Sequence, residues 1–170
     1  DGARRGVGYV PFDSERLVRG QLYEDIRDAV QQVAKPEEVD AVVVINLCVP
    51  TASGVPLDRL PRQIDGVRVI GIDVPGFGVP THAEAKDVLA GALLRTARGE
   101  AASGPVARPR GEVPGLPTIA PIGELFPGDP PGLGALIAPM GLALAPQTPA
   151  REWRDLYGAL DSVAVAALHP

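Results

Sequence analysis

The sequence predicts an α/β fold in which parallel sheets are flanked by helices. Two short runs, residues 41–47 and 67–72, are almost wholly apolar and rich in β-branched residues, which is typical of buried parallel strands. Each run ends in a segment that contains Pro and Gly and predicts a loop. Residues 81–98 then have the spacing of an amphipathic helix. Strand, loop and helix therefore follow one another as they do in a doubly wound sheet.

The composition is that of a folded, acidic chain with many turns. Its 170 residues include 20 Gly and 19 Pro, 45% are hydrophobic, and the formal net charge is −5. This hydrophobicity argues against disorder, and the negative charge argues against a nucleic acid partner. The longest apolar runs are far shorter than the roughly 20 residues of a membrane helix. We therefore expect a cytoplasmic protein with no membrane span.

The first predicted helix covers residues 18–34 and precedes the first strand. Pro36 ends this helix, because proline lacks the backbone N–H that a helix interior needs. The apolar side chains of the helix recur at spacings of three and four and predict one buried stripe: Leu22, Ile26, Val30 and Val33.

The second predicted strand, residues 67–72, is followed by a loop over residues 73–80 and then by a helix. Thr81 and Glu84 have the spacing of a capping box, in which a hydroxyl and a carboxylate bind the free amide groups at a helix start. An apolar stripe continues from there to about Arg98. This stripe predicts the helix that completes the unit.

The Gly-, Ala- and Pro-rich residues 99–117 lack a sustained period, so we interpret them as a linker. Residues 1–98 then form part of a first α/β domain, and residues 118–170 form the start of a second. In the second domain we expect alternating strands and helices at residues 118–123, 132–138, 142–145, 151–160 and 162–168. The helix at 151–160 has one apolar stripe, which predicts a core face: Trp153, Leu156, Tyr157 and Leu160.

Both ends of the sequence suggest a piece of a longer chain. It begins with Asp1 rather than Met, and the run at residues 162–168 predicts a strand whose continuation is missing. We therefore expect the end of one α/β domain and the beginning of the next.

Cys48, the one cysteine, immediately follows the first predicted strand. Open α/β sheets build their sites at the carboxyl ends of parallel strands, so a thiolate here could ligate an iron–sulfur cluster or act as a nucleophile. An inert buried thiol is the alternative, because free cysteines are among the most buried residues. A single cysteine excludes an internal disulfide, and two histidines leave few ligands for a zinc site within this chain.

The loop after the second strand contains Gly76, Phe77 and Gly78. Two glycines beside an aromatic residue favour close backbone packing against a flat ligand or a partner. The loop is not a dinucleotide fingerprint, because Thr81 stands where that motif needs glycine, and the sequence has no Walker-type Gly-Lys-Ser/Thr. Asp73, at the end of the strand, could position a substrate group or cap amides of the loop.

Beyond these patterns, several segments closely resemble the Y subunits of chlorophyllide a reductase. The two most specific are VINLCVPTASGVP at residues 44–56 and GIDVPGFGVPTHAEAKDVLAG at residues 71–91, and the similarity continues at residues 18–25 and 151–157. It covers nearly the whole chain outside the linker. That family is similar to the catalytic component of nitrogenase and to dark-operative protochlorophyllide reductase, which are built from successive Rossmann-like α/β domains.

The resemblance implies a heterotetramer of Y and Z subunits that reduces a ring B double bond of chlorophyllide a during bacteriochlorophyll biosynthesis. It also implies that electrons come from an ATP-hydrolysing iron–sulfur protein, the X subunit, and pass through a [4Fe–4S] cluster at the Y–Z interface. Cys48 matches the strand-end cluster cysteine of the family and is thereby assigned as a metal ligand. The resemblance implies that the other ligands lie in upstream segments and in the partner subunit.

The resemblance further places Gly76, Phe77 and Gly78 near the cluster or the partner surface, and it implies that this piece alone is not active. Two functions of other classes remain open. The chain could be a non-catalytic α/β binding or assembly module that lacks the cluster. It could also be a soluble enzyme with Cys48 as nucleophile, which thiol reagents would inactivate in the isolated chain.

Overall fold

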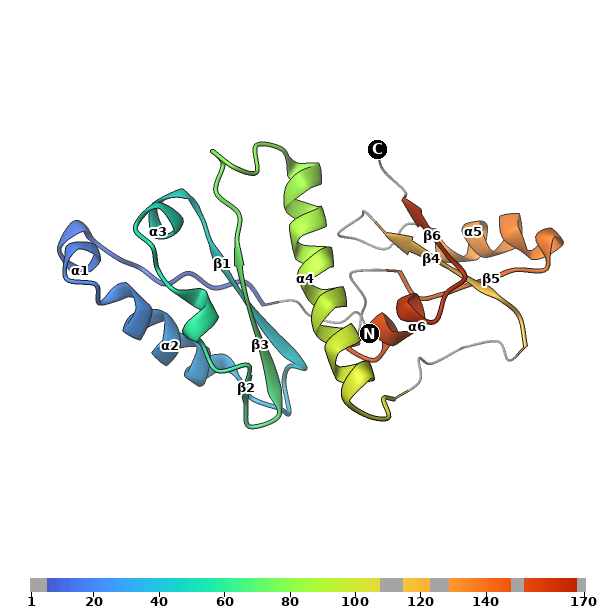
Figure 1. The fold of residues 1–170 in the computed structure, drawn as a ribbon, viewed down its shortest axis with the longest axis horizontal. Coiled ribbons are helices and arrows are strands. Elements are labelled where there is room, and N and C mark those ends of the chain that lie inside the picture. The colour runs from blue at the N-terminus through green and yellow to red at the C-terminus, as the bar shows by residue number, and fades with distance from the viewer. Residues whose placement is uncertain (1–5, 108–114, 123–128, 148–151, 168–170) are drawn as a thin grey trace. The chain divides into compact units, whose positions relative to one another are not determined.

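A computed structural model describes residues 6–107, 115–122, 129–147 and 152–167 of the chain. The chain divides into two compact units, Asp1–Thr81 and His82–Pro170 (Figure 1). Among the described residues, each unit contains a three-stranded sheet with helices. This architecture confirms the predicted α/β class.

The first unit is built around two parallel strands that end side by side. β1 pairs with β3 in parallel, as predicted, and the sheet order is β1-β3-β2. The register pairs Asn46 with Asp73, so the loops after β1 and β3 leave the same edge of the sheet. In chain order the elements are α1 (Ser14–Val18), α2 (Leu22–Val33), β1 (Ala41–Asn46), α3 (Cys48–Ala52), the 3-10 helix η1 (Leu57–Arg59), β2 (Gln63–Ile64) and β3 (Val67–Asp73).

The helix predicted over residues 18–34 is confirmed as α2, but it begins later than predicted, because a separate short helix, α1, precedes it. α1 ends at Val18 and α2 begins at Leu22. Gly20, between them, has a φ of 71°, a left-handed conformation that interrupts a right-handed helix. The two helices are joined by an ion pair of 2.8 Å between Arg16 and Asp25, and this hydrogen bond raises the pKa of the Arg16 guanidinium.

A short hairpin between β2 and β3 was not predicted. Its turn consists of Asp65 and Gly66, with φ values of 47° and 91°. Positive φ at both central positions suits a two-residue hairpin, and Asp-Gly is a common sequence for such a turn. This dipeptide was the signal that could have revealed β2.

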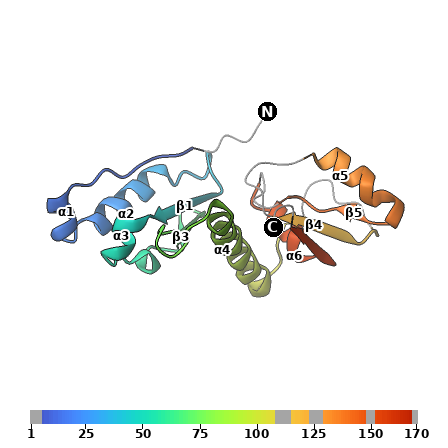
Figure 2. The ribbon, with the colours of Figure 1, turned by 90° about the horizontal axis from the view of Figure 1, so that it is seen from above.

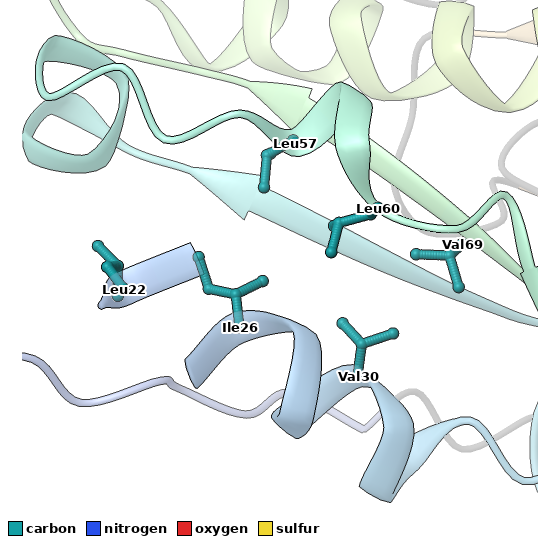
Figure 3. Packing of buried hydrophobic residues seen from close by; sticks show 6 residues of the cluster. All are labelled: Leu22, Ile26, Val30, Leu57, Leu60 and Val69. Atoms are coloured by element: carbon teal, nitrogen blue, oxygen red, sulfur yellow. The ribbon is translucent and has the colours of Figure 1, made fainter. Parts of the chain in front are cut away.

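One face of the first sheet is covered by α2 (Figure 1). Figure 3 shows side chains of α2 pointing toward β3 and the segment before it. The buried cluster consists of Leu22, Ile26, Val30, Leu57, Leu60 and Val69. Full burial of each such side chain contributes about 1.5–3 kcal/mol.

Two details of this core differ from the prediction. Val33, the last residue of the predicted stripe, is 52% exposed, because α2 ends there. β1 was expected to be covered on both faces, but Ile45 is 50% exposed, and in the described part of the chain β1 is an edge strand beside β3.

Gly71 is the point of closest approach between β3 and η1. A Cβ atom added to Gly71 would lie 2.6 Å from the Cβ of Leu57, which is too close for two carbon atoms. Glycine therefore allows Leu57 to pack directly on β3 and to join the buried cluster.

The second unit begins with a long helix and contains the other sheet, in the order β5-β4-β6 with both outer strands parallel to β4. Within this unit α5 lies beside β5 and α6 beside β4 (Figures 1 and 2). In chain order the elements are α4 (His82–Ser103), β4 (Thr118–Ile122), α5 (Pro130–Ile137), the 3-10 helix η2 (Ala138–Met140), β5 (Ala143–Leu144), α6 (Asp155–Leu160) and β6 (Ala164–Ala167).

The structure places helix ends and the division of the chain differently from the sequence interpretation. α4 starts directly after Thr81, as predicted, but runs to Ser103 and so enters the proposed linker at 99–117, part of which lies outside the described residues. α6 begins at Asp155, whereas the predicted helix began at residue 151, which lies outside the described residues. The two compact units separate at Thr81 and His82, whereas the sequence placed the end of the first domain at residue 98.

A polar contact ties α4 to the segment at the start of α6. The indole Nε1 of Trp153 and the hydroxyl of Tyr157 both donate to Oε2 of Glu100, at 2.8 and 2.5 Å. Trp153, Tyr157 and Leu156 are buried, which confirms the predicted core face, and Leu160 is half-buried. Among the described residues, none of the helices combines the length and apolarity that crossing a membrane requires.

Candidate functional site

The candidate site lies at the edge of the first sheet where β1 and β3 end. Cys48 begins α3 shortly after β1, and Gly76 lies in the loop after β3. Because the two strands are parallel and end in register, these two loops meet. This is the position at which open α/β sheets build their sites.

Cys48 is exposed, and its sulfur accepts a hydrogen bond from the protein backbone. The Gly76 N–H donates to the Cys48 Sγ at 3.1 Å, and the thiol forms no disulfide. Cys48 is thus not buried within the part of the chain that the structure describes. The thiolate is the form in which cysteine binds a metal, and a backbone N–H can donate a hydrogen bond to a metal-bound thiolate.

Three polar side chains, Asn46, Thr51 and Asp73, join the ends of the two strands next to this sulfur, and we call them the strand-end clamp. Asn46 is 1% exposed, and its Nδ2 donates to Oδ1 of Asp73 at 3.1 Å and to the carbonyl of Val55 at 3.2 Å. The Thr51 hydroxyl donates to the same Asp73 oxygen at 3.2 Å. The clamp thus connects β1, α3 and β3.

Local backbone geometry holds both loops in compact turns. The α3 turn is closed by the bond from the Thr51 N–H to the Leu47 carbonyl at 3.1 Å, and Gly54, with a φ of 69°, follows its end. In the second loop the amides of Gly78 and Val79 both donate to the Pro75 carbonyl, at 2.9 and 2.7 Å. This turn presents the Gly76 N–H to the sulfur.

The three residues singled out in the second loop have different surroundings. Gly76 contacts Cys48, and a Cβ added to it would lie 3.5 Å from the sulfur. Phe77 is 69% exposed, and a Cβ added to Gly78 would lie 3.6 Å from a side-chain carbon of Pro75. The structure therefore brings Gly76 into contact with Cys48. His82, the first residue of α4, is exposed and belongs to the second unit.

Sequence reasoning singled out Asp73 for a substrate group or for loop amides, whereas its carboxylate accepts side-chain hydrogen bonds from Asn46 and Thr51. Asn46 and Thr51 were missed. An amide side chain at the end of an otherwise apolar strand was the available signal for Asn46, because a buried polar group needs partners.

Among the described residues, the Cys48 sulfur is the one thiol ligand at this edge of the sheet. No group of three or more His, Cys, Asp or Glu side chains suited to a metal ion occurs among them. A metal cluster bound through Cys48 would therefore need further ligands from other segments or another chain. Exposure of Cys48 is compatible with such sharing.

Comparison with known proteins identifies relatives over the whole length of the chain. Two are chlorophyllide reductase 52.5 kDa chains, from Cereibacter sphaeroides and Rhodobacter capsulatus, which are 63% and 64% identical over 169 residues. These alignments cover 99% of this chain but 34% of each relative, so the chain spans about a third of their length. They confirm the resemblance seen in the sequence. Residues 5–170 match the nitrogenase component 1 type oxidoreductases, and the chain belongs to that family.

Proposed function

We propose that this chain is part of a chlorophyllide reductase subunit and that Cys48 supplies one ligand to an iron–sulfur cluster shared with a partner subunit. The observation that carries the proposal is the exposed Cys48 at the end of β1, in a chain 63–64% identical to chlorophyllide reductase chains. The substrate is then chlorophyllide a, and the reaction is the reduction of a ring B double bond.

The residues at the site fit one ligand of a [4Fe–4S] cluster. Thiolate is the usual protein ligand of such clusters, and potentials respond to hydrogen bonds to sulfur. The Cys48 Sγ has a backbone donor at 3.1 Å, and Cys48 is exposed at a sheet edge, where another chain can approach it. A bound cluster supplies single-electron transfer. Cys48 holds it in place, and the Gly76 amide neutralises part of the sulfur charge.

The remaining parts of the proposed enzyme lie outside this chain. In the proposal the other ligands come from upstream segments and from the Z subunit of a heterotetramer. Electrons come from the ATP-dependent X subunit. Phe77, 69% exposed beside Gly76, then lies at the partner surface or near the cluster.

The proposal is tested with the full-length subunit assembled with its partner and supplied with the ATP-dependent reductase, ATP and chlorophyllide a. We expect Cys48→Ala to lower the reduction rate by at least about 100-fold, since even outer-shell changes at metal sites cost about 10–100-fold. Ser53→Ala, an exposed position at the end of α3, is the matched control.

The two rival functions give different results in this assay. An assembly module without a cluster would leave the rate unchanged in the Cys48→Ala variant. A cysteine nucleophile would let this chain act without its partner and would make that activity sensitive to thiol alkylation. Either result would overturn the proposal.

A further inference from the structure

We propose that the strand-end clamp of Asn46, Thr51 and Asp73 positions the Cys48 sulfur under the Gly76 N–H and thereby raises the reduction potential of the cluster. This inference rests on the proposed function. The clamp residues act through Cys48 and Gly76, so they are positioning residues rather than ligands.

The clamp joins the two segments that carry the donor and the acceptor. Asp73 is the last residue of β3 and starts the loop that carries Gly76. One of its carboxylate oxygens accepts from Asn46, at the end of β1, and from Thr51, in the helix that begins with Cys48. These two bonds to one oxygen add to the backbone pairing of β1 with β3 in connecting the segments that carry Gly76 and Cys48.

Buried hydrogen bonds hold this arrangement in place. Asn46 is 1% exposed, and its amide nitrogen has both a side-chain and a main-chain acceptor. Its carbonyl accepts from the Val74 N–H at 2.8 Å, which extends the contact between the strands into the loop. A buried polar group with its partners in place resists displacement, because each lost partner leaves an unsatisfied group.

The Gly76 N–H would act on a bound cluster electrostatically. A reduced iron–sulfur cluster carries one more negative charge than the oxidised cluster, and part of that charge lies on the cysteine sulfur. An N–H directed at the sulfur stabilises the reduced form more than the oxidised form, so it raises the reduction potential. Loosening the clamp lengthens the bond of 3.1 Å from Gly76 and lowers the potential.

Two variants at Asp73 separate this effect from the effect of its charge. Both Asp73→Asn and Asp73→Ala remove the carboxylate charge, but the asparagine oxygen can still accept from Asn46 and Thr51. In the assembled, cluster-loaded complex of the full-length subunit, we expect a lower midpoint potential for Asp73→Ala than for Asp73→Asn in an EPR-monitored redox titration. Equal potentials at equal iron content would overturn the inference.

A second measurement detects the hydrogen bond itself and does not depend on the Asp73 variants. In complex labelled with ¹⁵N-glycine, pulsed EPR of the reduced cluster should show a ¹⁵N coupling from Gly76. The coupling should persist in Gly78→Ala and disappear in Gly76→Ala, where the unlabelled alanine keeps the N–H and its Cβ meets the sulfur at an ordinary 3.5 Å. A loaded complex without the coupling, or with a coupling unchanged in Gly76→Ala, would overturn the inference.

The iron content of Cys48→Ala distinguishes the two proposals. If Cys48→Ala loses the cluster but Asp73→Asn and Asp73→Ala have equal midpoint potentials, the ligand assignment stands and the inference about the clamp is wrong. If Cys48→Ala keeps the cluster, the proposed function is wrong and the inference about the clamp is wrong with it.

Discussion

The Gly76 N–H donates to the Cys48 sulfur at 3.1 Å although the two residues are 28 positions apart in the sequence. The contact exists because β1 and β3 are parallel and end in register at Asn46 and Asp73. The Cys48 sulfur, which follows β1, thus meets the Gly76 amide, which follows β3.

Asn46→Leu should destabilise the ends of both strands. The substitution leaves the Val55 carbonyl without the Asn46 donor and removes one donor from Asp73, a loss of about 1–3 kcal/mol. Hydrogen–deuterium exchange of peptides covering residues 41–56 and 67–80 in the full-length subunit measures the local free energy of opening. Ser53→Ala is the control, and equal protection in the two variants would show that the clamp adds no stability.

Gly71→Ala should destabilise the contact between β3 and η1. The new Cβ would lie 2.6 Å from the Cβ of Leu57, and relieving such overpacking costs about 1–3 kcal/mol. Gly78→Ala adds the same methyl group where the nearest protein atom is 3.6 Å away. Exchange of the β3 amides should therefore accelerate in Gly71→Ala and stay near the wild-type rate in Gly78→Ala; acceleration in both would contradict the packing described here.

Val30→Ala and Val33→Ala compare one substitution at two sites of α2. Val30 is 4% exposed within the buried cluster, so its truncation should cost about 1.5–3 kcal/mol. Val33 is 52% exposed, and its truncation should cost less than about 0.5 kcal/mol. Exchange protection of the α2 amides provides the measurement, and a similar loss at both positions would mean that Val33 is covered in the assembled protein.

Tyr157→Phe should weaken the contact between α4 and α6. The variant removes the hydroxyl that donates to Glu100 at 2.5 Å and accepts from Trp153 at 3.1 Å, which we expect to cost about 1–3 kcal/mol. Tyr9→Phe, at a residue that is 90% exposed, is the matched control. Faster exchange in α4 and α6 for Tyr157→Phe alone is the expected result, and unchanged exchange in both variants would exclude a stabilising role for this hydroxyl.

Local sequence patterns predicted those elements that local chemistry determines. The β-branched runs identified β1 and β3, and Thr81 marked the start of α4. The end of α4 was missed because residues 99–103 lack a clear apolar period, whereas in the structure Glu100 is held by Trp153 and Tyr157, more than fifty positions away. Such a tertiary contact leaves no trace in a local window of sequence.

The candidate site could be predicted only in part, because local sequence does not show tertiary contacts. Cys48 could be identified as a candidate because it is the one cysteine of the sequence and follows a predicted strand. Its contact with Gly76 and the bonds among Asn46, Thr51 and Asp73 depend on the register of β1 against β3. Two strands that are almost wholly apolar specify their register only weakly by alternation, since most of their residues are suitable for either face.

The most direct test of the central claim is the iron and acid-labile sulfide content of the full-length subunit assembled anaerobically with its partner. If Cys48 is a cluster ligand, Cys48→Ala should lower both contents and the EPR signal of the reduced cluster, while Ser53→Ala should keep them at the wild-type level. A Cys48→Ala complex with the full wild-type content of iron and sulfide would contradict the account.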